Sequence, residues 1–102
     1  MTRDRAIAVL RAYEQELRRA GVASLSLFGS VARDEVTPAS DIDLAVRLAP
    51  GFSGGGFDYF GRFEDLRAEL AAILGCEVDL VEEPAEHPTL QQAIDQDRAL
   101  AF

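Results

Sequence analysis

Two aspartates stand two residues apart inside an apolar stretch, "DIDLAV", residues 41–46. Burying an ionised carboxylate without a partner is costly, so a strand that carries Asp41 and Asp43 needs something to compensate their charge. Side chains two residues apart on a strand point to the same face, which places these carboxylates together. A third acid, Asp79, interrupts the apolar stretch "EVDLV" in the same way. It joins the other two if the two strands are neighbours.

Three carboxylates on one face would repel one another. Two like charges about 4 Å apart repel by roughly 4 kcal/mol at an effective dielectric near 20, so the acids would be protonated, splayed into water or bound to a cation. Oxygen ligands alone favour a hard ion such as Mg²⁺ or Mn²⁺. His87 is the only histidine and Cys76 the only cysteine, which argues against zinc. The simpler alternative is that the acids solvate an exposed sheet face.

A glycine and a serine follow another apolar stretch, "SLSLF", residues 24–28. If the chain turns into a helix at Gly29 and Ser30, backbone N–H groups are left unpaired there, and they suit an anion such as phosphate. The glycine allows close approach of the backbone, and the serine adds a hydroxyl donor. The alternative is that Ser30 only caps the turn.

The elements that position these residues follow from the spacing of apolar side chains. Helical spacing predicts helices over 3–20 and from Phe60 to Leu74, with one helical turn at 30–33. A final helix is predicted after Pro88 from the spacing of Leu90, Ala93, Ile94 and Asp97. Alternation predicts strands over 24–28, 41–48 and 77–81, and residues 49–56 read as a loop. Leu100 and Phe102 are candidate packing residues. The fold class is therefore α/β (α+β), a small mixed sheet with helices on one face and the other face open or covered by a partner.

Composition limits the classes of function. The 102 residues suit one domain, 1–102, and 48% apolar residues are enough for a folded core. A net charge of −8 argues against direct binding of nucleic acid and favours a small nucleotide with its metal ions, or a basic protein partner. The N-terminus lacks the apolar run of a signal peptide and no stretch is long enough to span a membrane, so we expect a cytoplasmic protein. Glu77, Glu82 and Glu83 are expected at the solvated surface.

The spacing of these motifs carries a family resemblance. Gly29-Ser30, ten residues, then Asp41-x-Asp43, with the later "VDLV", resembles the nucleotidyltransferases of the DNA polymerase β-like superfamily. More narrowly, "LFGSVAR…SDIDLAV" resembles the minimal nucleotidyltransferases (MNT type) of prokaryotes. The resemblance extends from the first helix to about Ile94. It implies the polymerase β-like nucleotidyltransferase core.

The resemblance also implies how the carboxylates act. Asp41 and Asp43 would bind two divalent ions, Mg²⁺ with Mn²⁺ as an alternative, and Asp79 would bind the catalytic one and help to deprotonate the acceptor hydroxyl. The reaction would transfer a nucleoside monophosphate from an NTP, with ATP favoured, to a hydroxyl, and release pyrophosphate. All three ligand positions are present, which favours an active enzyme.

The phosphate-binding residues implied by the resemblance are Gly29, Ser30 and Arg33. The guanidinium of Arg33 suits phosphate geometry, but it could equally pair with Asp34, Glu35 or a carboxylate of the sheet. Many relatives have glycine where this chain has Asp34. A carboxylate at that position could hold Arg33 and weaken phosphate binding.

The resemblance further implies a partner. Small members of the family are often encoded beside a HEPN-domain ribonuclease as a toxin–antitoxin pair, in which AMP is added to a tyrosine of the toxin and silences it. The alternative is a non-catalytic module that neutralises its partner by occlusion. A third possibility is a small-molecule acceptor, which would need another domain or a dimer to enclose it; the oligomeric state stays open.

Overall fold

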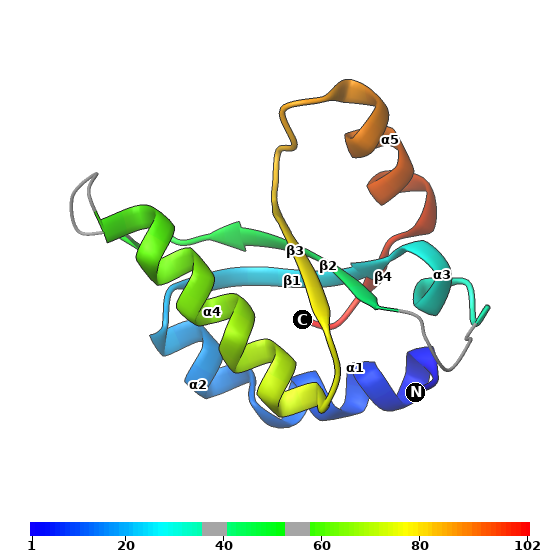
Figure 1. The fold of residues 1–102 in the computed structure, drawn as a ribbon, viewed down its shortest axis with the longest axis horizontal. Helices are drawn as coiled ribbons and strands as arrows, with labels where there is room; N and C mark the ends of the chain where they lie inside the picture. The colour runs from blue at the N-terminus through cyan, green and yellow to red at the C-terminus, as the bar shows by residue number, and fades with distance from the viewer. Residues whose placement is uncertain (36–40, 53–57) are drawn as a thin grey trace.

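A four-stranded sheet forms the centre of the protein in a computed structural model, which describes residues 1–35, 41–52 and 58–102 (Figure 1). Its strands are β1 (Val22–Phe28), β2 (Ile42–Leu48), β3 (Val78–Glu82) and β4 (Ala99–Leu100), in the order β3-β2-β1-β4. β1 pairs antiparallel with β2 and β4, whereas β2 and β3 are parallel. The predicted fold class, a mixed sheet with helices, is confirmed. The predicted loop at 49–56 lies partly outside the described residues.

The predicted first helix is two helices, α1 (Arg3–Ala12) and α2 (Glu14–Arg19), separated at Tyr13. The backbone of Tyr13 leaves helical geometry, with φ −104° and ψ 10°. Leu10 and Leu17 lie seven residues apart and are both fully buried. Their spacing keeps the apolar stripe in phase across the break, which is why periodicity alone did not reveal it.

The main core lies between one face of the sheet and three helices, α1, α2 and α4 (Tyr59–Leu74). Leu27 and Leu44 of the sheet and Leu70 of α4 are fully buried there. A short helix, α3 (Gly29–Ala32), continues directly from β1. Over the described residues, none of the helices is both long and apolar enough to cross a membrane.

The last helix, α5 (Pro88–Asp97), lies over the opposite face of the sheet (Figure 1). Its Ile94 is fully buried against Phe28 and Ala45, which form a second, smaller core. The expectation of helices on one face therefore holds for α1, α2 and α4 but not for α5. The helix covers part of the face that carries the aspartates, so this face is only partly open.

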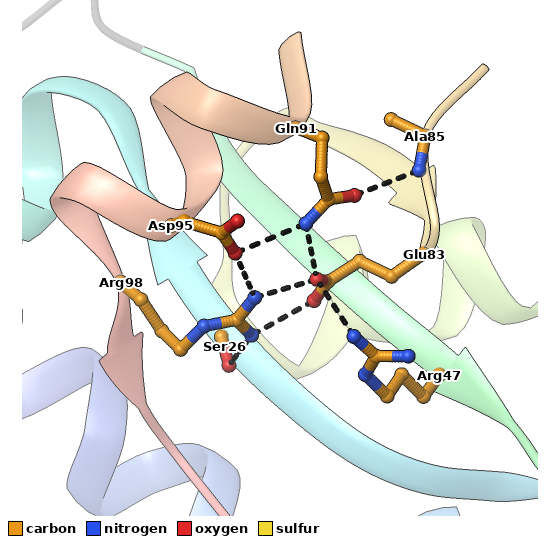
Figure 2. Close-up of polar contacts among 7 residues, drawn as sticks. All are labelled: Ser26, Arg47, Glu83, Ala85, Gln91, Asp95 and Arg98. Atoms are coloured by element: carbon orange, nitrogen blue, oxygen red, sulfur yellow. Dashed lines mark hydrogen bonds and ion pairs between the residues drawn. The ribbon is translucent and has the colours of Figure 1, made fainter. Parts of the chain in front are cut away.

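A polar cluster fixes α5 to the sheet, and Figure 2 shows it around Glu83. The side chain of Glu83 is 1% exposed. Arg98 donates to both of its carboxylate oxygens, at 2.8 and 2.5 Å, and Gln91 donates at 2.9 Å. Arg47 of β2 lies 3.6 Å away. These bonds, above all those from Arg98, hold the pKa of Glu83 below its usual range.

The prediction that Glu83 is a solvated surface residue is therefore wrong. Its partners come from β2 and from α5 and the residue that follows it, and only the folded chain brings them together. Glu77 is exposed as expected, whereas Glu82 is half-buried and accepts a hydrogen bond from the hydroxyl of Tyr59.

The C-terminus adds a strand that periodicity did not predict. β4 has two residues, too few to show alternation, and Ser26 lies opposite Leu100 in its register. Leu100 is 53% exposed, so its predicted packing role is wrong. Phe102 does pack: it is half-buried, and the guanidinium of Arg18 lies 5.0 Å from its ring centre.

Candidate active site

The three predicted carboxylates lie at one end of the sheet, where β2 and β3 begin. β2 and β3 are neighbours, and Asp43 lies directly opposite Asp79 in their parallel register. Asp41 lies directly before β2, and its charge contributes to the raised pKa of Asp43. Asp43 is half-buried, whereas Asp41 and Asp79 are exposed. Both strands begin here, so the carboxylates lie at the N-terminal ends of β2 and β3 and not in the centre of the sheet.

The electrostatics of this end are unfavourable for negative charge. Burial, followed by the charges of Asp79 and Asp41, raises the pKa of Asp43, and the nearby charge of Arg33 opposes these effects. An acid with a raised pKa holds its proton more tightly than it would in water. A bound cation would relieve this repulsion.

The donor set suits a hard divalent ion because all three side chains offer carboxylate oxygens. Among the described residues, no group of three histidine, cysteine, aspartate or glutamate side chains is already close enough to hold a metal ion. Asp43 and Asp79 are paired by the register, and Asp41 is exposed directly before β2. The residues therefore fit the ion chemically, and the ligands would converge as it binds.

Gly29 lies directly against Asp43. Its φ is +73°, in the left-handed region that favours glycine, and an added Cβ atom would lie 2.3 Å from the Oδ2 atom of Asp43. A side chain here would therefore displace the central carboxylate. β1 runs antiparallel to β2, with Phe28 opposite Asp43, so the end of β1 delivers the Gly-Ser turn to the start of β2.

Ser30 follows at the start of α3 and is half-buried. The N-cap position of this short helix belongs to Phe28, so the alternative role of Ser30 as the cap of the turn does not apply. The Ser30 carbonyl accepts from the N–H of Glu35 at 2.8 Å, which closes the turn.

Arg33 is exposed and engaged in two ion pairs. Its Nη1 atom lies 2.5 Å from Oδ2 of Asp97 at the end of α5, and its Nε atom lies 3.3 Å from Oε2 of Glu35. The predicted alternative of a pair with Glu35 is therefore correct. Asp97 was missed: it is 64 residues away in the chain, and nothing in its local sequence distinguishes it from other acids on α5.

Asp34 contacts a different arginine. Its carboxylate accepts from the backbone N–H of Arg3 at 3.0 Å and lies 3.7 Å from the Arg3 guanidinium. Its φ is +58°, a conformation that glycine adopts without strain. This geometry explains why glycine suits the position, and it removes the concern that Asp34 holds Arg33.

The sequence profile described as the nucleotidyltransferase domain matches residues 10–101. The chain belongs to this family. It is 35% identical over 91 residues to MJ1379 of Methanocaldococcus jannaschii, which is named as a candidate protein adenylyltransferase, and the match covers 87% of each chain. This minimal nucleotidyltransferase is therefore an enzyme of the nucleotidyl-transferring class.

Two solved structures extend the comparison. One, described as a minimal nucleotidyltransferase, superposes with a TM-score of 0.70 at 29% identity and covers 97% of this chain and 95% of its own. The other is a complex of a tri-AMPylated HEPN toxin from Shewanella oneidensis with its MNT antitoxin. It matches with a TM-score of 0.56 at 25% identity, over 89% of this chain and 70% of that chain.

Proposed function

We propose that this nucleotidyltransferase moves AMP from ATP onto a hydroxyl group of a partner protein and releases pyrophosphate. The observation that carries the proposal is the register of Asp43 with Asp79, with Gly29 packed against Asp43. The relative named for protein adenylylation supports AMP as the transferred group. The activity would reside in the single domain 1–102, in the cytoplasm, where ATP is supplied.

Asp41, Asp43 and Asp79 would hold two divalent ions, Mg²⁺ or alternatively Mn²⁺. Such ions stabilise the negative charge that develops on the attacking and leaving oxygens of an in-line displacement. Asp79 is exposed at the start of the edge strand, so it can accept the proton of an arriving hydroxyl. Asp43 is the least exposed of the three, and its raised pKa reflects a position that a cation would stabilise.

Gly29, Ser30 and Arg33 would bind the phosphates. Gly29 leaves space for close approach of the backbone, and Ser30 brings its hydroxyl to the same turn. The exposed guanidinium of Arg33 pairs with the exposed Glu35 and the half-buried Asp97, and ion pairs of a solvent-exposed side chain contribute little to stability. A triphosphate carries more charge than either carboxylate and would compete with both for the guanidinium.

The partner would be a HEPN ribonuclease toxin. The solved complex of a tri-AMPylated HEPN toxin with its MNT antitoxin supports this assignment. The net charge of −8 also suits a partner with a basic surface, because opposite charges speed association and exclude wrong partners.

The deciding experiment follows the label of α-labelled ATP. Wild type, Asp43→Asn and a control with an exposed acid changed, Asp65→Asn, would each be incubated with Mg²⁺ and a purified HEPN-domain protein, and also with a lysate of the source cell. We expect label on the HEPN protein with wild type and Asp65→Asn, none with Asp43→Asn, and none when EDTA is added.

The same experiment separates the two functions considered above. If folded wild type transfers no label from ATP, CTP, GTP or UTP but still captures a partner, the chain acts by occlusion. Label on a different protein would support the proposed transfer of AMP and would reject the HEPN protein as the acceptor.

A further inference from the structure

The outer edge of β3 carries backbone groups that point away from the sheet. β3 is the terminal strand, and no other strand among the described residues pairs with that edge. On its inner side, the N–H of Ile42 donates to the carbonyl of Glu77 at 3.1 Å, and the N–H of Glu83 donates to the carbonyl of Val46 at 2.8 Å. Backbone groups alternate in direction along a strand, so those of Leu80 and Glu82 face outward.

A groove follows this edge. A cavity of about 730 Å³ is lined by Tyr59, Phe60 and Phe63 of α4 on one side, by Leu80 of β3, and by Leu90 of α5 on the other. Figure 1 shows β3 rising from the end of α4 towards α5. Phe60 is 80% exposed, the most open of the large apolar side chains described. An apolar groove beside an open strand edge is the geometry in which extended peptides bind.

We propose that the acceptor protein binds through an extended segment that adds to the outer edge of β3 and brings its hydroxyl side chain to Asp79. This inference rests on the proposed function and specifies how the acceptor is recognised. Residues opposite each other on neighbouring strands lie about 5 Å apart and share a face. The acceptor residue opposite Asp79 therefore points to the face that carries Asp43, while neighbouring apolar side chains enter the groove.

The transfer step forms one bond and breaks another at the α-phosphorus of ATP. The acceptor oxygen forms a bond to the α-phosphorus of ATP, and the bond from that phosphorus to the bridging oxygen breaks. Pyrophosphate leaves with the bonding electrons, and the hydroxyl proton passes to Asp79.

Charge identifies the occupant as a basic segment of another protein rather than a second copy of this chain. Asp79, Glu82 and Glu86 lie on or beside the edge and the groove. Acidic side chains on an edge strand disfavour pairing with an identical edge and favour lysine or arginine in the added strand.

The first test uses synthetic peptides as probes. The parent peptide has a central tyrosine between alternating valines and lysines, and two versions carry N-methyl groups on one or the other set of alternate residues. In an added strand only one set of amides faces β3. We expect wild type to label the parent and one methylated peptide, and to label the other at least about tenfold less. Equal labelling or equal loss for the two methylated peptides would overturn the proposal.

The second test changes the groove. Phe60→Ser removes an exposed wall of the groove, and the matched control Leu100→Ser removes an exposed apolar side chain from β4, at the opposite edge of the sheet. We expect Phe60→Ser to raise the KM for the peptide about tenfold and to leave the KM for ATP unchanged. An effect of Leu100→Ser instead would place the acceptor at β4 and refute the proposal.

Failure of this inference is distinguishable from failure of the proposed function. If wild type labels the HEPN protein but none of the peptides, transfer stands and docking at β3 is rejected. If no protein or peptide is labelled, the proposed function itself fails and the docking proposal falls with it.

Discussion

Asp43 of β2 and Glu83, which directly follows β3, lie on the same face of the sheet at opposite ends of these two parallel strands, and their environments are opposite. Around Glu83 the neighbours are Arg98, Arg47 and Gln91, and these hold its pKa down. Around Asp43 the nearest charges are other carboxylates, and its pKa is raised. At one end of the face, the closed end, arginines compensate the acid, whereas at the other, the open end, burial and the neighbouring carboxylates outweigh the attraction of Arg33. A cation can stabilise only the second, which is why the two acids differ in role.

The largest expected effect is at the closed end. Glu83→Gln removes the charge that Arg98 and Arg47 share in a buried position, and breaking such a pair costs about 3 kcal/mol. We expect the free energy of unfolding, measured with urea, to fall by about that amount. Glu86→Gln, at an exposed acid nearby, should leave it unchanged. A loss equal to that of the control would mean that Glu83 does not anchor α5.

At the open end, a substitution of Asp43 should change the free energy of unfolding by a smaller amount and in the opposite direction. Asp43→Asn relieves the repulsion by Asp79 and Asp41, so it should raise the free energy of unfolding by about 1 kcal/mol while abolishing transfer. Urea unfolding and the labelling assay measure the two changes on the same protein. A destabilised variant would show that attraction to Arg33 outweighs the repulsion, and would remove the contrast between the two ends.

Lowering the pH should reduce the difference in the free energy of unfolding between each variant and wild type. Glu83→Gln is less stable than wild type at neutral pH, and Asp43→Asn is more stable. Because the pKa of Glu83 is lowered in the folded state, its stabilisation is complete above the ordinary value of about 4.5 and is lost as pH falls through the folded pKa. Because the pKa of Asp43 is raised, its penalty is complete above the folded pKa and vanishes as pH falls below about 3.8.

The measurement is a series of urea unfolding curves for wild type, Glu83→Gln and Asp43→Asn from about pH 7 to about pH 3.5. At about pH 7 we expect a lower free energy of unfolding for Glu83→Gln than for wild type and a higher one for Asp43→Asn, and both differences should decrease as the pH falls. Differences that stay constant with pH would assign the effects to packing rather than to charge.

The same contrast explains what could be predicted from the sequence. The residues of the open end lie in short motifs, and alternation within two strands is enough to place Asp41, Asp43 and Asp79 on one face. The close approach of the backbone at Gly29 was predicted because the glycine directly follows an apolar strand. The three longer strands and the helix at 59–74 were predictable because each has several apolar residues in phase.

The closed end could not be predicted because its partners are distant in the chain. Glu83 has the same local character as the exposed Glu77, and only the packing of α5 on the second face brings Arg98 to it. Asp97 was missed for the same reason. Burial of an acid depends on where a neighbouring element docks, which a pattern within one element does not record.

The smallest change is expected from a substitution of Asp97, the last residue of α5, which pairs with Arg33 near the open end. Asp97→Asn should change the urea midpoint little, because the guanidinium of Arg33 is exposed to solvent, which weakens the pair. It should lower the KM for ATP about threefold, with kcat unchanged, because the carboxylate competes with phosphate for the guanidinium. Asp95→Asn, which changes an exposed acid of α5 that pairs with Arg98 instead, is the control. A raised KM would mean that Asp97 holds Arg33 in position for the phosphates. The docking of α5 by the Glu83 cluster would then also help to position a residue of the active site.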